Sequence, residues 1–360
     1  MPWMRLSSVV AILVCAGPVW AGVYNPAELD EGPLDEVYVG KFGTTLKFLA
    51  SIGAPQVEVD SPIRRRYFFQ ERMYDQLDPG KLSVEQKLHF SSVLIRRRRP
   101  GDAIGLLLPA TRQHPDVFLL QSNLATAYDM NGDKTKAREI MTDCLETWPK
   151  EWHQLTDAQR EFHMHLGWNE GVFAFYREVE ASYLKLLRLR TREPKEAAAQ
   201  FEAVDALFGD DKGGVKFVNE AGEFEPGKIA KAERAKLPRN AQAIVQQLLV
   251  WQPYDLRLQW LLGELLNAKG SPSDIKAARF IFDDLVFNEK VRAKELMARR
   301  LILNNWVEPV QETRRDDDGT QVMNWRALAI SFAVGMMVAV FGHWQIREIR
   351  RRRQTSTTGA

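Results

Sequence analysis

The sequence predicts an all-α fold: a solenoid of helix-turn-helix repeats with a small inserted β-hairpin, followed by one C-terminal transmembrane helix. Three observations predict it. The 360 residues are 45% apolar and 27% charged, which is typical of a folded protein. Small residues and prolines recur every 34 residues between positions 84 and 151. Near the C-terminus, the 20 residues 327–346 include no Asp, Glu, Lys or Arg, enough for about 30 Å of helix.

Charge and cysteine content exclude two classes of protein. Forty-nine basic residues stand against 47 acidic ones, a net charge of +2, so the whole chain has no field that would attract nucleic acid. The two cysteines are Cys15 and Cys144. Because Cys15 lies in a segment that we expect to be removed, a disulfide framework within the mature chain is excluded. We expect Cys144 to be a buried, inert thiol.

Residues 1–21 have the composition of a secretory signal peptide. Arg5 precedes an uncharged stretch that ends at Trp20, and Val19 and Ala21 stand where a signal peptidase prefers small residues. We expect cleavage after Ala21, and an uncleaved N-terminal anchor is the alternative. Residues 22–80 then comprise an acidic, extended lead-in up to residue 40 and helices at 41–52 and 62–77.

Residues 81–151 contain two units of a repeat. Ser83 and Gln86 have the spacing of a capping box at the start of the first helix. Small residues let paired helices approach closely, and proline ends a helix because it cannot continue the hydrogen-bond ladder. Each unit, 84–117 and 118–151, is therefore predicted to form a helix, a turn and a second helix. The positions that correspond are Ala103 with Ala137, Leu107 with Met141, Ala110 with Cys144, and Pro115 with Pro149.

This pattern resembles the tetratricopeptide-repeat family, in a membrane-anchored bacterial envelope type. The run from Asn123 to Tyr128 and the turn from Asn131 to Asp133 are similar to the family consensus. The family's tryptophan position holds Lys87 and Gln121 instead. Residues 239–306 contain a divergent unit, whose matching positions are Pro253, Leu262, Gly263, Leu266, Ala278, Phe282 and Leu285. The resemblance implies stacked helix pairs with a concave face that binds a peptide or a partner domain.

In the family, fixed positions on the first helix of each unit line that concave face. Transferred to this sequence, these partner-binding positions are Leu88, Ser92, Ile95, Arg96, Ser122, Thr126, Asp129, Met130, Trp260 and Glu264. The lysine and asparagine set that clamps a peptide carboxylate in some members is absent from them. We therefore expect a mixed polar and apolar surface. The alternative is that the extra helices at 41–77 or 156–192 cover these side chains.

Between the repeat units, residues 152–210 are predicted to be helical. Thr156 and Gln159 form a second capping box, which opens a helical region to Arg192 with a break near Gly167 or Gly171. Glycine, valine and phenylalanine then alternate with turn residues in an insert at 211–238. That insert predicts a hairpin with strands at 213–218 and 223–226 and a turn at 219–222. A further helix is expected at 291–305.

The C-terminal segments indicate a membrane anchor. Proline, three aspartates and a glycine make 307–324 a flexible stalk. The predicted transmembrane helix, 325–346, has a tryptophan near each end, and five arginines crowd the tail at 347–360. Because basic flanks stay in the cytoplasm, the tail is inside and the N-terminal domain is outside the inner, or cytoplasmic, membrane. The signal peptide requires the same single-pass orientation.

One face of that helix repeats a small residue every fourth position, at Ala327, Ser331, Gly335 and Ala339. Such a face allows two helices to pack closely, so a homodimer is one interpretation. The alternative is that small residues are simply common in membrane spans.

No sequence motif of phosphate, dinucleotide or nucleophile-elbow type is present, so we expect neither catalysis nor a cofactor. His163 and His165 are the one histidine pair to weigh as metal ligands, but on a helix they point about 200° apart. We therefore expect no metal site. The predicted function is a membrane-anchored scaffold or assembly factor that binds another protein or peptide of the cell envelope. An assembly chaperone for a secreted or cofactor-bearing client is one alternative, and an enzyme with a site in 156–235 is another.

Overall fold

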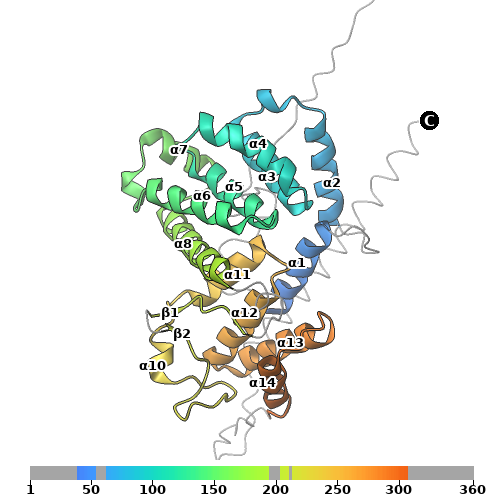
Figure 1. The fold of residues 1–360 in the computed structure, drawn as a ribbon, viewed down its shortest axis with the longest axis vertical. Coiled ribbons are helices and arrows are strands. Elements are labelled where there is room, and N and C mark those ends of the chain that lie inside the picture. The colour runs from blue at the N-terminus through green and yellow to red at the C-terminus, as the bar shows by residue number, and fades with distance from the viewer. Residues whose placement is uncertain (1–38, 54–61, 194–202, 211–212, 307–360) are drawn as a thin grey trace, which may run out of the picture. The chain divides into compact units, whose positions relative to one another are not determined.

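The computed structural model of the chain describes residues 39–53, 62–193, 203–210 and 213–306, which are mostly helical (Figure 1). This confirms the all-α class. The helices in chain order are α1 (Val39–Ile52), α2 (Pro62–Asp75), α3 (Val84–Arg96), α4 (Pro100–Gln113), α5 (Phe118–Met130), α6 (Lys134–Thr147), α7 (Asp157–His165), α8 (Glu170–Arg192), α10 (Lys231–Arg234), α11 (Ala241–Trp251), α12 (Leu256–Lys269), α13 (Pro272–Phe287) and α14 (Lys294–Asn304).

Several predicted segments lie outside the described residues. They are the signal peptide at 1–21, the lead-in up to residue 38, the stalk at 307–324, the span at 325–346 with its small-residue face, and the tail at 347–360. Among the residues that the structure describes, no helix is both long and apolar enough to cross a membrane.

The bounds of α3 to α6 repeat with the period of the sequence. α3 begins at Val84 and α5 at Phe118, 34 residues later, and α4 and α6 begin at Pro100 and Lys134 with the same spacing. Their last residues also differ by 34 positions. Consecutive helices in this group pack against one another, and Gly132 turns the chain between α5 and α6 at a φ of 89°. A positive φ is readily adopted only by glycine, which explains its place in this turn.

Both predicted capping boxes are present. The Ser83 hydroxyl accepts a hydrogen bond from the Gln86 backbone, and the Gln86 side chain accepts one from the Ser83 backbone. Thr156 and Gln159 make the same reciprocal pair at the start of α7. The predicted break in the following helical region is at Gly167, whose φ of 79° separates α7 from α8. Local hydrogen bonding thus sets the starts of α3 and α7.

The predicted hairpin at 213–226 is wrong in its strands. β2 covers only Gly213–Gly214 and pairs antiparallel with β1, Gly209–Asp210. The turn after Asn219 does form, but Phe217 is buried in the core, and the Val218 carbonyl accepts from the backbone of Ala230 instead of from a facing strand. Burial of an aromatic ring against the helices therefore replaced the predicted strand pairing.

Helix α1 joins the two hydrophobic clusters of the described part of the chain. Phe42 and Leu46 pack in the larger cluster, which includes residues of α3 and α4 and extends through α5 to α14. Leu49 and Ile52, one and two turns further along, pack in the smaller cluster with residues of α2, α3 and α4. Figure 1 shows α1 running between these two groups of helices. α1 is thereby fixed beside α12 and α13, where it forms one wall of the site described next.

Candidate functional site

The ten residues assigned to a partner-binding face do not form an open groove. Asp129 and Met130 are half-buried, and the other eight are buried: Leu88, Ser92, Ile95, Arg96, Ser122, Thr126, Trp260 and Glu264. The expectation of an exposed surface at these positions is corrected accordingly. The alternative, in which further helices cover the side chains, describes the structure.

Helices α8 and α11 provide the cover over the α3–α6 units. The Ser122 hydroxyl donates a hydrogen bond to the carboxylate of Glu180 on α8. Tyr183, also on α8, donates its hydroxyl to Asp129 at 2.9 Å. Arg96 donates from Nη1 to the carbonyl oxygen of the last residue of α11 at 3.1 Å. Polar side chains that would meet a ligand in an open groove are therefore bonded to the chain's own helices.

In the divergent unit, Trp260 and Glu264 are also fully buried. Trp260 donates from Nε1 to Glu264 Oε1 at 2.7 Å, and Glu264 Oε2 lies 2.5 Å from Arg299 Nη1 on α14. Burial raises the pKa of Glu264 to about 7, although the nearby guanidinium and indole N–H both act to lower it. The Glu264–Arg299 ion pair fixes α14 against α12 and leaves no room for a ligand between these two helices.

Four of the ten, Ile95, Arg96, Asp129 and Met130, line a cavity of about 230 Å³ that continues to α8 and to the turn between α11 and α12. Its charged groups form hydrogen bonds or ion pairs within the chain. Arg190 donates to Asp205 at 2.7 Å and to Asp255, two carboxylates that are almost completely buried. Burial raises the pKa of Asp129, against hydrogen bonds from Tyr183 and Gln252 that act to lower it. We interpret this cavity as a polar junction between helices.

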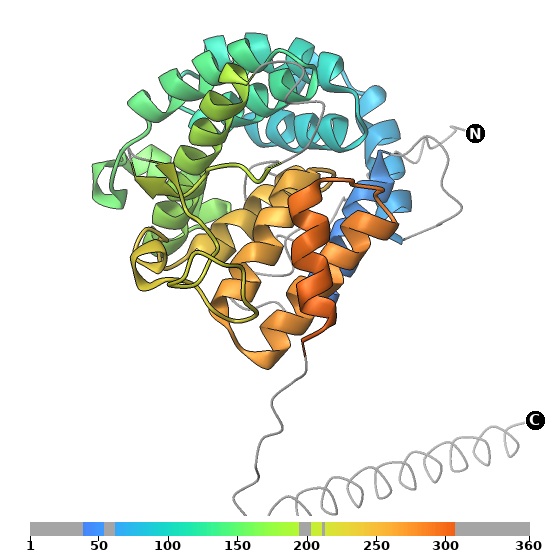
Figure 2. The same cartoon turned by 60° about the horizontal axis from the view of Figure 1, so that its bottom comes forward.

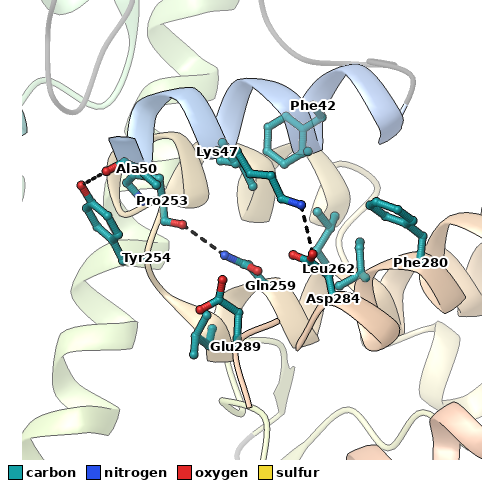
Figure 3. Close-up of a pocket in the computed structure, with 14 residues that line it drawn as sticks. Phe42, Lys47, Ala50, Pro253, Tyr254, Gln259, Leu262, Phe280, Asp284 and Glu289 are labelled. Atoms are coloured by element: carbon teal, nitrogen blue, oxygen red, sulfur yellow. Dashed lines mark hydrogen bonds and ion pairs between the residues drawn. The ribbon is translucent and has the colours of Figure 1, made fainter. Parts of the chain in front are cut away.

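A second, apolar pocket of about 160 Å³ lies between α1, the turn before α12, α12 and α13 (Figure 3). Its apolar wall consists of Phe42, Leu46, Ala50, Pro253, Leu256, Leu262, Phe280 and Ile281. Tyr254 donates its hydroxyl to the carbonyl of Ala50, which fastens the end of α1 to the turn before α12. Phe280 is 55% exposed, so a large apolar side chain stands open at the mouth of the pocket.

Charged and polar groups border this apolar wall. Lys47 Nζ on α1 lies 3.0 Å from Asp284 Oδ1 on α13, across the mouth in Figure 3. Gln259 donates to the carbonyl of Pro253 at 3.1 Å, and Glu289 is exposed after the end of α13. An apolar depression with a polar border is the usual arrangement of a site that receives an anchor side chain from a partner.

Size distinguishes the ligands that this pocket can accept. Pockets for cofactors and drug-sized ligands have volumes of about 300–1,000 Å³, well above its 160 Å³. A cavity of about 150 Å³ is known to accept a benzene ring. The pocket therefore suits one aromatic or branched aliphatic side chain and not a nucleotide or a flavin.

His163, His165 and Cys144 line neither of these two cavities. His163 is 2% exposed, stacks on Phe118 with ring centroids 4.8 Å apart, and bonds the carbonyl of Gln159 through Nδ1 at 2.6 Å, whereas His165 is exposed. Within the described residues there is no cluster of three or more potential metal ligands. Cys144 is buried as expected, and burial raises the pKa of its thiol.

The comparisons with known proteins leave the site without a precedent. No protein-family model, no curated protein and no solved structure matches the chain. The resemblance to the tetratricopeptide repeat therefore rests on the residues and helix bounds given above.

Sequence reasoning missed the pocket between α1, α12 and α13, although one signal was present. Phe280 and Phe282 are two positions apart and so about 200° apart on a helix. Both cannot face the core, and Phe282 is fully buried while Phe280 is exposed. A single exposed apolar residue is common on protein surfaces, so Phe280 indicates a contact site only together with the pocket beside it.

Proposed function

We propose that this chain is a membrane-anchored, extracytoplasmic scaffold or assembly factor built from tetratricopeptide-like helix pairs. Its role is to bind another protein of the cell envelope, not to catalyse a reaction. The partner inserts one aromatic or branched apolar side chain into the pocket between α1, α12 and α13. The observation that carries the proposal is this pocket's apolar lining, its size and the exposed Phe280 at its mouth.

The repeat character of the proposal is supported by two features. The helices of the units 84–117 and 118–151 begin and end 34 residues apart. In the divergent unit, Gly263 of α12 faces the ring of Phe282 on α13, which is where a small residue lets paired helices approach. Stacked helix pairs commonly serve as surfaces for other proteins.

The cellular location is proposed from sequence features alone. The signal-peptide pattern at 1–21, the uncharged run at 327–346 and the arginine-rich tail agree on one orientation. In that orientation α1 to α14 lie outside the cytoplasm, and the partner is therefore sought among envelope proteins.

The test uses the full chain in native membranes, with a photo-reactive phenylalanine analogue in place of Phe280. We expect it to cross-link to a specific partner. Gly43 lines the pocket, and a Cβ added to it would have no atom within 4 Å. Gly43→Leu should therefore fill the pocket without straining α1 and reduce the cross-link by at least about tenfold, the effect of losing a typical anchor.

A matched control separates occupancy of the pocket from a general effect of the substitution. Gly105 on α4 is also helical and exposed, with no atom within 4 Å of an added Cβ. Gly105→Leu should leave the cross-link unchanged. Cross-linking that persists in the Gly43→Leu chain, or no specific adduct from position 280, would contradict the pocket as the binding site.

A further inference from the structure

Helix α14 carries an apolar stripe on the side that faces away from the core. Met297, Leu301 and Ile302 are 43%, 58% and 39% exposed, and Ala298 lies between them and is also exposed. Figure 1 shows α14 at the lower end of its group of helices, and Figure 2, in which this end comes forward, shows it at the front. An exposed stripe of large apolar side chains on a terminal helix needs a partner, because terminal helices of repeat proteins are normally polar outside.

The orientation of α14 is fixed from its inner side. Leu296 and Leu303 are buried in the core, and Arg299 lies 2.5 Å from the buried carboxylate of Glu264. Arg299 also pairs with Glu295 on its own helix, and Arg300 pairs with Asp283 on α13. Rotating the apolar stripe inward would expose these groups, so the stripe cannot be hidden by a small rearrangement.

Basic and aromatic residues adjoin the stripe at the turn between α13 and α14. Lys290, Arg292 and Lys294 are exposed there, together with the acidic residues Glu289 and Glu295. Phe287 is 51% exposed, and the guanidinium of Arg300 lies 4.2 Å from its ring centre. Apolar side chains bordered by lysine, arginine and an aromatic ring are typical of helices that lie in the headgroup region of a membrane.

If residues 327–346 anchor the chain, as proposed above, the length of the connection keeps this surface near a bilayer. The described part ends at Trp306, and the uncharged run begins at Ala327, so 20 residues separate them. A flexible linker of that length has a root-mean-square span of about 25 Å. Such a tether raises the effective concentration of the α14 surface at the bilayer. A contact with lipid that would be too weak for an untethered domain is then sufficient for docking.

We propose that the α14 stripe, with Phe287 and the basic residues of the preceding turn, docks on the anionic lipid surface beside the chain's own anchor. This inference rests on the proposed anchor. Lipid is favoured over a second copy because four residues on two helical turns expose far less than the roughly 800 Å² that each partner of a stable protein interface buries. Docking holds the α13 end of the pocket close to the membrane, where a membrane-bound partner would reach it.

The experiment uses the full chain in vesicles of phosphatidylglycerol and phosphatidylcholine. A nitroxide label is attached at Leu301→Cys, or at Met164→Cys as a control, since Met164 is similarly exposed, at 57%, on α7. Cys144 is fully buried and does not compete for the label, and Cys15 is replaced by serine in both labelled chains. Collisions with oxygen, which concentrates in lipid, are compared with collisions with a water-soluble nickel chelate.

We expect the label at 301 to collide mainly with oxygen and the label at 164 mainly with nickel. Adding Ile302→Asp should make the label at 301 collide mainly with the nickel chelate. A label at 301 that meets nickel as often as the label at 164 would overturn the inference, and so would a label shielded from both, which indicates a protein cover such as a second copy. Alkaline carbonate extraction tests the anchor separately: extraction of the chain would refute the anchor, whereas oxygen contact at 301 would still support docking.

Discussion

Replacing Gly263 with alanine should destabilise the protein, although the same change usually strengthens a helix. Gly263 lies within α12, where alanine is favoured over glycine by about 0.5–1 kcal/mol. A Cβ at this position would be 2.3 Å from Cε1 and 2.9 Å from Cδ1 of Phe282 on α13. Phe282 is fully buried, so its ring cannot move aside without displacing its neighbours.

Overpacking of a core typically costs about 1–3 kcal/mol. Subtracting the gain in helix propensity leaves a net loss of up to about 2.5 kcal/mol in the free energy of unfolding, with a central value of about 1 kcal/mol. Gly105→Ala on α4 provides the control, because an added Cβ there meets no atom within 4 Å. That variant should gain about 0.5–1 kcal/mol.

The measurement is urea unfolding of the full chain in detergent, followed by tryptophan fluorescence. The midpoint should fall for Gly263→Ala and rise for Gly105→Ala, and adding Phe282→Leu to Gly263→Ala should recover part of the loss. A midpoint that rises for both single variants would refute the close approach of α12 and α13. Equal losses in the single and double variants would show that the ring is not the obstacle.

Two further predictions concern buried titratable groups. Burial lowers the pKa of His163 from 6.5 to about 4. Between pH 6.5 and pH 4 the unfolded chain therefore binds more protons at this residue than the folded chain does. The free energy of unfolding consequently falls as the pH drops through this range, by up to about 3 kcal/mol. His163→Phe should remove this contribution, which urea titrations at several pH values would detect as a change in the profile, and His165→Phe should not. His89, whose pKa is also lowered to about 4, and Glu264, whose pKa is raised to about 7, keep their own contributions in both variants. Asp205→Asn should cost about 1.5–3 kcal/mol, the value of charge-assisted hydrogen bonds, because Arg190 still pairs with Asp255 and Arg257 with Glu193. Asp102→Asn, at a pair whose carboxylate is 57% exposed, should cost less than about 1 kcal/mol. Similar midpoints for these two variants would contradict the assigned burial.

Much of the helical framework could be predicted because it depends on local sequence. The capping residues Ser83 and Thr156 bond backbone groups within three positions, so their effect is visible without a fold. The break at Gly167 follows from the backbone freedom of glycine. The insert after Gly213 was predicted less well, because Phe217 buries its ring against distant helices, and that choice depends on contacts that no local pattern encodes.

The candidate site was harder to predict than the fold, because it depends on which helices contact one another in the folded chain. The pocket joins α1 to α13 across more than 200 positions, as the Lys47–Asp284 pair shows. Periodicity identified both helices but gave no register between them. The resemblance to the tetratricopeptide repeat assigns positions such as Ser122 to a binding face, yet nothing in the period tells whether another helix covers them.

The covering of that face has a consequence for recognition. On α8, Glu180 accepts a hydrogen bond from Ser122, and Tyr183 donates one to Asp129. These polar groups of the inner face are therefore already bonded within the chain. A partner that displaced α8 would leave these buried groups unpaired, at a cost of about 1–3 kcal/mol each. The pocket beside α1 requires no such displacement, because its wall is apolar and its Lys47–Asp284 pair is at the rim with the lysine 58% exposed. Recognition at the outer edge of the helix array is therefore energetically easier than recognition at the inner face that the family uses.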